Sequence, residues 1–356
     1  HGFESRVRHE LSQWRMRYPQ PKAKHLELAS AVMARLLEHN YRSISRHATG
    51  HLFSARQCAD YMQRVYRVAS ERCAVIPQAV SSAYLSKQRV ADIERLGRVL
   101  YVGQNTFFKA PMILGAAISE LLVRFPSISF TWVCAAADHS RALAHFIPEV
   151  RNRVNLLDWM PQDKLVDVYD RHGLFLFPSF FEGFGKVFLE AMSRGLVVIA
   201  ADNGGMRDVI SHGVDGFKVP TGDVAAMVAQ AERVLLAPDL AVEISGHAVA
   251  TASQFTWDRY ASACTEFYER LRRLRGVGHV SGGSPLAICT GAGAGTWARA
   301  KPASPARTTA SSHAGPAQAS PEPVVFSTSQ GGFDSTAARS SACTSASGDV
   351  PNASSP

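Results

Sequence analysis

Residues 174–201 read LFLFPSFFEGFGKVFLEAMSRGLVVIAA, and this stretch indicates the fold. An apolar run of strand length at 174–177 is followed by a glycine-rich loop, a helical stretch at 186–193 and a second apolar run at 197–201. Two strands joined through a helix over short connections lie parallel in one sheet with a right-handed crossover. The stretch therefore predicts a strand-helix-strand unit.

The same alternation extends back to residue 98. The expected strands there are 99–102, 129–134 and 154–157, and the expected helices are 112–124 and 163–170. Regular alternation of this kind predicts the α/β class, with a Rossmann-like, doubly wound parallel sheet.

Residues 1–92 contain about half the elements of a second α/β domain. Apolar residues at helical spacing, with arginines between them, predict a basic amphipathic helix at 3–18. The further expected elements are a helix at 26–37, a strand at 51–54, a helix at 57–70 and a strand at 73–76. The chain opens on His1 in a helical pattern, so we expect this N-terminal domain to be truncated.

The C-terminal part combines one helix with a long segment of low complexity. Thr256 is a good N-cap for this helix and Gly276 a good stop. The Ala, Ser, Gly and Pro that follow cannot bury enough apolar surface to order the chain. We expect an incomplete Rossmann-like domain at 1–92, a second such domain at 93–255, a helix at 256–275 and a disordered tail at 276–356.

Composition narrows the class of protein. The formal charge of +8 and the pI near 9.3 suit contact with phosphate groups, in a nucleotide, a nucleic acid or an anionic membrane surface. A solvated helix face explains the arginines of the first helix as well as anionic lipid does. The six cysteines have no metal-binding spacing. No run reaches the about 20 apolar residues of a membrane-spanning helix. We expect a cytoplasmic protein that has at most peripheral contact with a membrane.

The glycine-rich loop is the expected ligand site. Ligands of open α/β sheets bind beyond the carboxyl ends of the strands, which is where this loop lies. Gly183 and Gly185 allow a close backbone approach, and the first N–H groups of the next helix attract an anion such as a diphosphate. Glu182 and Glu190 lie at different depths of the same cleft, where carboxylates bind vicinal hydroxyls of a sugar.

This loop resembles the signature of the family 4 retaining glycosyltransferases. Seven residues separate Glu182 from Glu190, Gly-Phe-Gly lies between them, and Ala191-Met192 follows. Further resemblances are the Gly204-Gly205 turn, Asp208, the Gly213 to Gly216 stretch, Val75-Ile76-Pro77, Val102-Gly103 with Lys109, and His1-Gly2. Gln104 departs from the family, which usually has a phosphate-binding arginine there.

The resemblance implies a GT-B fold and transfer of a sugar with retention of the anomeric configuration. It implies a UDP- or GDP-linked donor, a glycan, lipid or small-molecule hydroxyl as acceptor, no metal or other cofactor, and no nucleic-acid partner. The implied catalytic residues are Glu182, His1 and Lys109. The implied donor-binding residues are Gly103, Lys109, Gly183, Phe184, Gly185 and Glu190, and the position of Trp159 and Met160 after a strand suits either contact with the base or core packing.

Other functions remain open at this point. The chain could be an inactive fragment that binds nucleotide without turnover, and a nucleotide-sugar epimerase or glycan phosphorylase shares the architecture without the full signature. A nicotinamide oxidoreductase needs Gly-x-Gly-x-x-Gly after a strand, which Val102-Gly103-Gln104 does not supply. Gly291, Gly293 and Gly295 lack a preceding strand, and the adjacent Asp138 and His139 are not expected to act as an acid/base pair.

Overall fold

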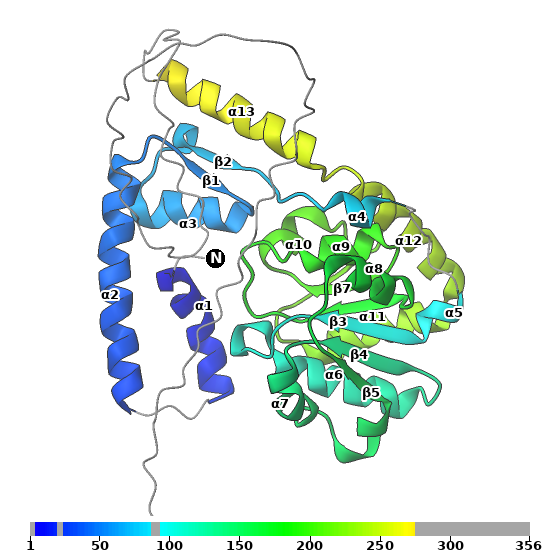
Figure 1. Cartoon of the computed structure of the whole chain (residues 1–356). Helices are drawn as coiled ribbons and strands as arrows, with labels where there is room; N and C mark the ends of the chain where they lie inside the picture. The colour runs from blue at the N-terminus through cyan, green and yellow to red at the C-terminus, as the bar shows by residue number, and fades with distance from the viewer. Residues whose placement is uncertain (1–3, 20–23, 87–92, 275–356) are drawn as a thin grey trace, which may run out of the picture. The chain divides into compact units, whose positions relative to one another are not determined.

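A six-stranded parallel sheet organises the larger part of the chain (Figure 1). The computed structural model describes residues 4–19, 24–86 and 93–274. The strands are β3 (Arg98–Val102), β4 (Ser129–Val133), β5 (Val154–Leu157), β6 (Leu174–Phe177), β7 (Val197–Ala201) and β8 (Phe217–Val219). They lie in the order β5-β4-β3-β6-β7-β8, and every neighbouring pair is parallel. This is the doubly wound order, so the predicted α/β fold is confirmed.

The central strands are apolar along their whole length because helices cover both faces of the sheet. Every residue of β6 and β7 is buried, as expected for parallel strands in this type of fold. The covering helices are α6 (Pro111–Arg124), α7 (His139–Leu143), α8 (Gln162–Asp170), α9 (Val187–Ser193), α10 (Gly204–Val209), α11 (Val224–Leu236) and α12 (Pro238–Ala252). α6 packs against α11, and α9 packs against α12.

The N-terminal part contains a small parallel sheet of β1 (His51–Phe53) and β2 (Cys73–Val75), with the helix α3 (Arg56–Tyr66) between them in sequence. The other helices of this part are α1 (Glu4–Arg17), α2 (Lys24–His47), α4 (Ser82–Leu85) and α5 (Ile93–Leu96). The parallel pairing of β1 with β2 confirms the α/β character expected for 1–92. The domain boundaries proposed from the sequence stay predictions.

Two helices connect the N-terminal part with other segments. α13 (Trp257–Leu274) packs Phe267 and Leu271 against Ile76, beside β2. Thr256 Oγ1 accepts a hydrogen bond from Arg259 N at 3.3 Å, which confirms it as the N-cap of α13. α1 packs Leu11 among residues that flank the six-stranded sheet, including Phe180 and Phe181.

Several helix ends differ from the sequence-based expectations. α2 continues to His47 instead of ending near residue 37. The helix expected at 57–70 ends at Tyr66, because Arg67 adopts a left-handed conformation with φ of 56°. The expected tail at 276–356 lies outside the described residues.

Taken singly, the described helices differ from membrane-spanning helices in length and composition. None of them is by itself long and apolar enough to cross a bilayer, whereas α11 and α12 together meet the criterion of length and composition, with a bend of 107° between them.

Candidate functional site

The candidate site lies where the order of the large sheet reverses. β3 and β6 are neighbours although β4 and β5 separate them in sequence. The loops that follow β3 and β6 therefore meet beyond the carboxyl edge of the sheet, which is where open α/β sheets bind ligands. Gly103 follows β3 directly, and a Cβ at this position would lie 2.5 Å from the hydroxyl of Tyr101. Only glycine fits there.

Lys109 and Glu182 form an ion pair across these two loops. Lys109 ends a short 3-10 helix, Phe107–Lys109, and its Nζ lies 2.5 Å from Glu182 Oε1. Ser179 Oγ donates to the same carboxylate oxygen at 2.9 Å. Both side chains are largely buried, with 17% of Lys109 and 8% of Glu182 exposed. The structure thus brings together two of the three residues that the sequence predicts as catalytic.

Three glycines lie close to the Glu182 carboxylate at positions where a larger residue would clash or be strained. Gly185 has φ of 88°, a conformation that favours glycine. A Cβ on Gly204 would lie 2.7 Å from Glu182 Cβ, and one on Gly205 would lie 2.3 Å from Phe184 Cδ2. Gly205 N also donates to the carbonyl of Phe184 at 3.0 Å. The Gly204-Gly205 segment therefore packs directly against the 182–185 loop.

Glu190 lies in the first turn of α9 and is almost fully buried. Tyr169 Oη donates to Glu190 Oε2 at 3.2 Å, and Tyr84 also hydrogen-bonds this carboxylate. Burial raises the pKa of Glu190, while the charge of Lys186 and the two tyrosine bonds lower it. A ligand hydroxyl at Glu190 would have to share or replace these tyrosine bonds.

The other residues predicted from the sequence differ in whether they reach a ligand. The ring of Phe184 is buried and packs against Phe188, with 5.6 Å between centroids, so its side chain belongs to the core and only its backbone faces a ligand. Trp159 is 38% exposed, whereas Met160 packs against the hydrophobic core. His1 lies outside the described residues. Within the described part, no group of three His, Cys, Asp or Glu side chains has the arrangement of a metal site.

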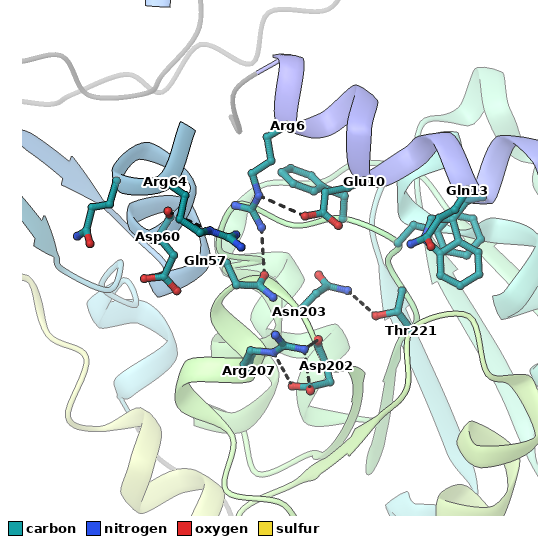
Figure 2. Close-up of a pocket in the computed structure, with 14 residues that line it drawn as sticks. Arg6, Glu10, Gln13, Gln57, Asp60, Arg64, Asp202, Asn203, Arg207 and Thr221 are labelled. Carbon is teal, nitrogen blue, oxygen red and sulfur yellow. Dashed lines mark hydrogen bonds and ion pairs between the residues drawn. The ribbon is translucent and has the colours of Figure 1, made fainter. Parts of the chain in front are cut away.

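A cavity of about 600 Å³, which no local pattern in the sequence indicates, lies next to this loop (Figure 2). Its wall comes from α1, from α3 and from the segments that follow β6, β7 and β8, and it includes Phe180 and Phe181 but neither Glu182 nor Glu190. Arg6 is one of the lining residues and is only 3% exposed, so the expectation of a solvated or lipid-facing side chain is wrong for this arginine. It is buried because it contacts α3: its NH2 donates to Gln57 Oε1 at 3.1 Å.

Comparisons with known proteins agree with this architecture. A family model described as Glycosyl transferases group 1 matches residues 97–237. D-inositol 3-phosphate glycosyltransferase of Thermobispora bispora is 28% identical over 235 residues, which are 60% of this chain and 55% of that protein. The same enzyme of Rhodococcus jostii is 27% identical over 256 residues, 67% of this chain and 55% of that protein. The chain thus spans about half the length of the curated relatives it matches.

Solved structures show the same fold at low identity. Sucrose-phosphate synthase from Thermosynechococcus elongatus has a TM-score of 0.57 at 21% identity, covering 68% of this chain and 62% of that one. Anabaena HepE in complex with UDP-glucose has a TM-score of 0.55 at 20% identity, covering 70% of this chain and 69% of that one.

Proposed function

Because the chain belongs to the glycosyltransferases with the GT-B fold, with its Glycosyl transferases group 1 match at residues 97–237, we propose that it binds a nucleotide-sugar donor at the loops after β3 and β6. The observation that carries this proposal is the ion pair of Lys109 with Glu182 at the reversal point of the sheet. A buried cation and a buried carboxylate held side by side suit a ligand that is a diphosphate at one end and a polyol at the other.

Each residue has a role that its contacts support. Lys109 Nζ stabilises the negative charge that develops on the leaving diphosphate. The two hydrogen bonds to Glu182 from described residues both end on Oε1, so Oε2 accepts from a hydroxyl of the transferred sugar. Glu190 accepts from the ribose hydroxyls. The backbone amides of Gly183, Phe184 and Gly185 hold the sugar and the phosphates, as the small residues and the open turn allow.

The proposed reaction is transfer of the sugar to an acceptor hydroxyl. The hydroxyl oxygen forms a bond to the anomeric carbon, and the bond from that carbon to the diphosphate oxygen breaks. The nucleoside diphosphate leaves with the electron pair, and the hydroxyl proton passes to one of its phosphate oxygens. We propose retention of the anomeric configuration and independence of metal ions, because the Glu182 to Glu190 segment resembles the signature of retaining enzymes.

The ligands named for the similar proteins narrow the proposed donor and acceptor classes. HepE was solved with UDP-glucose, which supports a UDP-hexose ahead of a GDP-linked sugar. The curated relatives are named for D-inositol 3-phosphate, which supports a hydroxyl of a small molecule or glycan as acceptor. Trp159, exposed at the end of the segment after β5, is the proposed contact of the base. His1 stays a proposed contact of the reacting sugar.

Calorimetric titration of the full chain with UDP, GDP and UDP-glucose tests the donor site. We expect UDP to bind, and Lys109→Ala to weaken its binding at least about tenfold, because a hydrogen bond to a charged group contributes about 1.5 to 3 kcal/mol. Glu182→Gln should weaken UDP-glucose more than UDP. Arg259→Ala, which removes one charge from the exposed side of α13, is the matched control.

The outcome that contradicts the proposal is the absence of binding for both nucleotides. Mass spectrometry of products with UDP-glucose and a sugar acceptor then tests transfer. Binding without product would favour a nucleotide-binding chain without turnover, and conversion of the donor without an acceptor would favour an epimerase. Product formation that continues in excess EDTA is the expected result for a metal-independent enzyme.

A further inference from the structure

The cavity beside the donor loop has walls from both parts of the chain. α1 contributes Arg6, Glu10, Gln13 and Trp14, and α3 contributes side chains that include Gln57 and Asp60. Figure 2 shows Arg6 and Glu10 across from Asn203 and Thr221, which come from the segments after β7 and β8, and Gln57 beside Asn203. No residue of the proposed donor site lines this cavity, so it is a separate place for a ligand.

Asn203 carries a polar atom without a partner. Its side-chain nitrogen donates to the carbonyl of Ser179 at 2.7 Å and to Thr221 Oγ1 at 3.3 Å. The residue is only 9% exposed, and its Oδ1 is buried without a hydrogen-bond partner among the described residues. A buried acceptor without a partner is costly, and a donor from a bound ligand would satisfy it.

Gln57 supplies the complementary donor on the same wall. Its Oε1 accepts from Gly204 N at 2.9 Å and from Arg6 NH2 at 3.1 Å. Because both of these groups are donors, the amide oxygen is fixed on that side, and the amide nitrogen is the end that can donate to a ligand. An acceptor at Asn203 and a donor at Gln57 match a hydroxyl group, which both donates and accepts.

The charges of the cavity are balanced. Arg6 lies 3.8 Å from Glu10, and Arg207 lies 3.0 Å from Asp202. The third arginine, Arg64, donates from Nε to the backbone carbonyl of Asp60 at 3.4 Å, and the Asp60 carboxylate belongs to the same lining. The lining thus carries three arginines and three carboxylates and has no net positive charge to attract a phosphate, so it favours an uncharged ligand.

Aromatic rings close one side of the cavity next to the proposed sugar site. Trp14 stacks on Phe180 with 4.4 Å between centroids and an interplanar angle of 6°. Phe180 and Phe181 precede Glu182, and Ser179, which Asn203 holds through its carbonyl, donates to the Glu182 carboxylate. A ring bound in the cavity would therefore lie beside the carboxylate that faces the transferred sugar.

We propose that this cavity is the acceptor subsite and that it takes an uncharged polyhydroxylated ring, a sugar or cyclitol, in preference to a phosphorylated one. The assignment rests on the proposed glycosyl transfer for its role as acceptor site, whereas the preference for a neutral polyol rests on the cavity alone. One ring hydroxyl donates to Asn203 Oδ1 and accepts from Gln57, and an apolar face of the ring lies against the aromatic side.

Matched pairs of ligands test the preference. Calorimetric titration of the full chain, saturated with UDP, uses myo-inositol against D-inositol 3-phosphate and glucose against glucose 6-phosphate. We expect the neutral member of each pair to bind at least about tenfold more tightly. Asn203→Ala should weaken the neutral ligand about tenfold, the effect of losing one buried hydrogen bond, and should leave UDP affinity within about twofold.

A change of charge gives a second, independent readout. Asp202→Asn removes the carboxylate beside Arg207, and we expect it to tighten the phosphorylated ligands about tenfold. Asp239→Asn, an exposed substitution on α12, is the control and should change neither ligand. The proposal is overturned if the phosphorylated ligands bind more tightly to the unmodified chain, if neither class binds, or if Asn203→Ala leaves neutral binding unchanged. UDP binding in the same samples reports separately on the proposed donor site.

Discussion

Replacing Arg194 by methionine is expected to destabilise the chain strongly, because this arginine joins three segments from the inside. It follows α9 and is 2% exposed. Its Nε and NH2 donate to the two carboxylate oxygens of Asp170, at 2.7 and 2.8 Å, in a bidentate pair. Its NH1 donates to the carbonyls of Ser86 and Tyr84, at 2.5 and 3.1 Å. Tyr84 in turn hydrogen-bonds Glu190.

The magnitude follows from what the substitution leaves behind. Methionine keeps most of the apolar stem of Arg194 in place but leaves the Asp170 carboxylate and two carbonyl groups without their donor. Removing one partner of a buried ion pair costs about 3 to 5 kcal/mol. Asp170 is 19% exposed and can recover some hydration, so we expect a loss of about 3 kcal/mol in the free energy of unfolding, at the lower end of that range.

Urea unfolding of the full chain, followed by circular dichroism, measures this loss. Arg141→Met is the control, since Arg141 is 72% exposed in its pair with Asp138 and should contribute less than about 1 kcal/mol. The double variant Arg194→Met with Asp170→Leu should recover much of the lost stability, because it leaves no buried charge unpaired. A loss for Arg194→Met as small as the loss for Arg141→Met would refute the reasoning.

Three further predictions use other local features. Arg67→Gly should raise the free energy of unfolding by up to about 1 kcal/mol, because this exposed residue has φ of 56°; an unchanged urea midpoint would contradict it. Gly205→Ala should destabilise the chain by about 1 to 3 kcal/mol and weaken UDP-glucose, since its Cβ would lie 2.3 Å from Phe184 Cδ2; Gly246→Ala, where nothing lies within 4 Å, is the control. Burial lowers the pKa of His172 from 6.5 to about 4, so the unfolded chain takes up a proton at higher pH than the folded chain does. Stability contributed by neutral His172 should therefore be present above pH 6.5 and decrease by about 3 kcal/mol as the pH falls towards 4, and His172→Gln should remove that part of the pH dependence measured by urea unfolding.

The large sheet could be predicted because its strands carry their own signal. β6 and β7 begin and end at the predicted residues, since every position in them is buried and apolar. α11 and α12 are missing from the sequence-based expectations, although Asp223 gives a recognisable N-cap by accepting from Ala226 N at 2.9 Å. The end of α3 could not be predicted, because an arginine, Arg67, adopts the left-handed conformation that Gly or Asn usually marks in a sequence.

In the candidate site, too, the features within one short segment could be predicted, whereas contacts between distant segments could not. The pattern from Glu182 to Glu190 is local, so the sequence identifies it as a candidate ligand loop. Lys109 meets Glu182 only because β3 and β6 are neighbours, which depends on the order of strands in the sheet and on no local pattern. The tyrosine bonds to Glu190 likewise come from α4 and α8, far away in the sequence.

The cavity could not be predicted at all, since none of the segments that form its wall has an unusual sequence pattern. Arg6 and Glu10 have the i,i+4 spacing of an ordinary ion pair on a helix, and Gln57 lies in the first turn of another helix. They become a binding surface only when α1 and α3 meet Asn203 at the carboxyl edge of β7. If that meeting forms the acceptor subsite, then substitutions in α1 should change the choice of acceptor while the affinity for UDP stays constant. Glu10→Gln, which removes a charge from the cavity wall without touching the donor loops, separates the two effects: an equal loss of UDP and acceptor binding would mean that α1 only supports the fold.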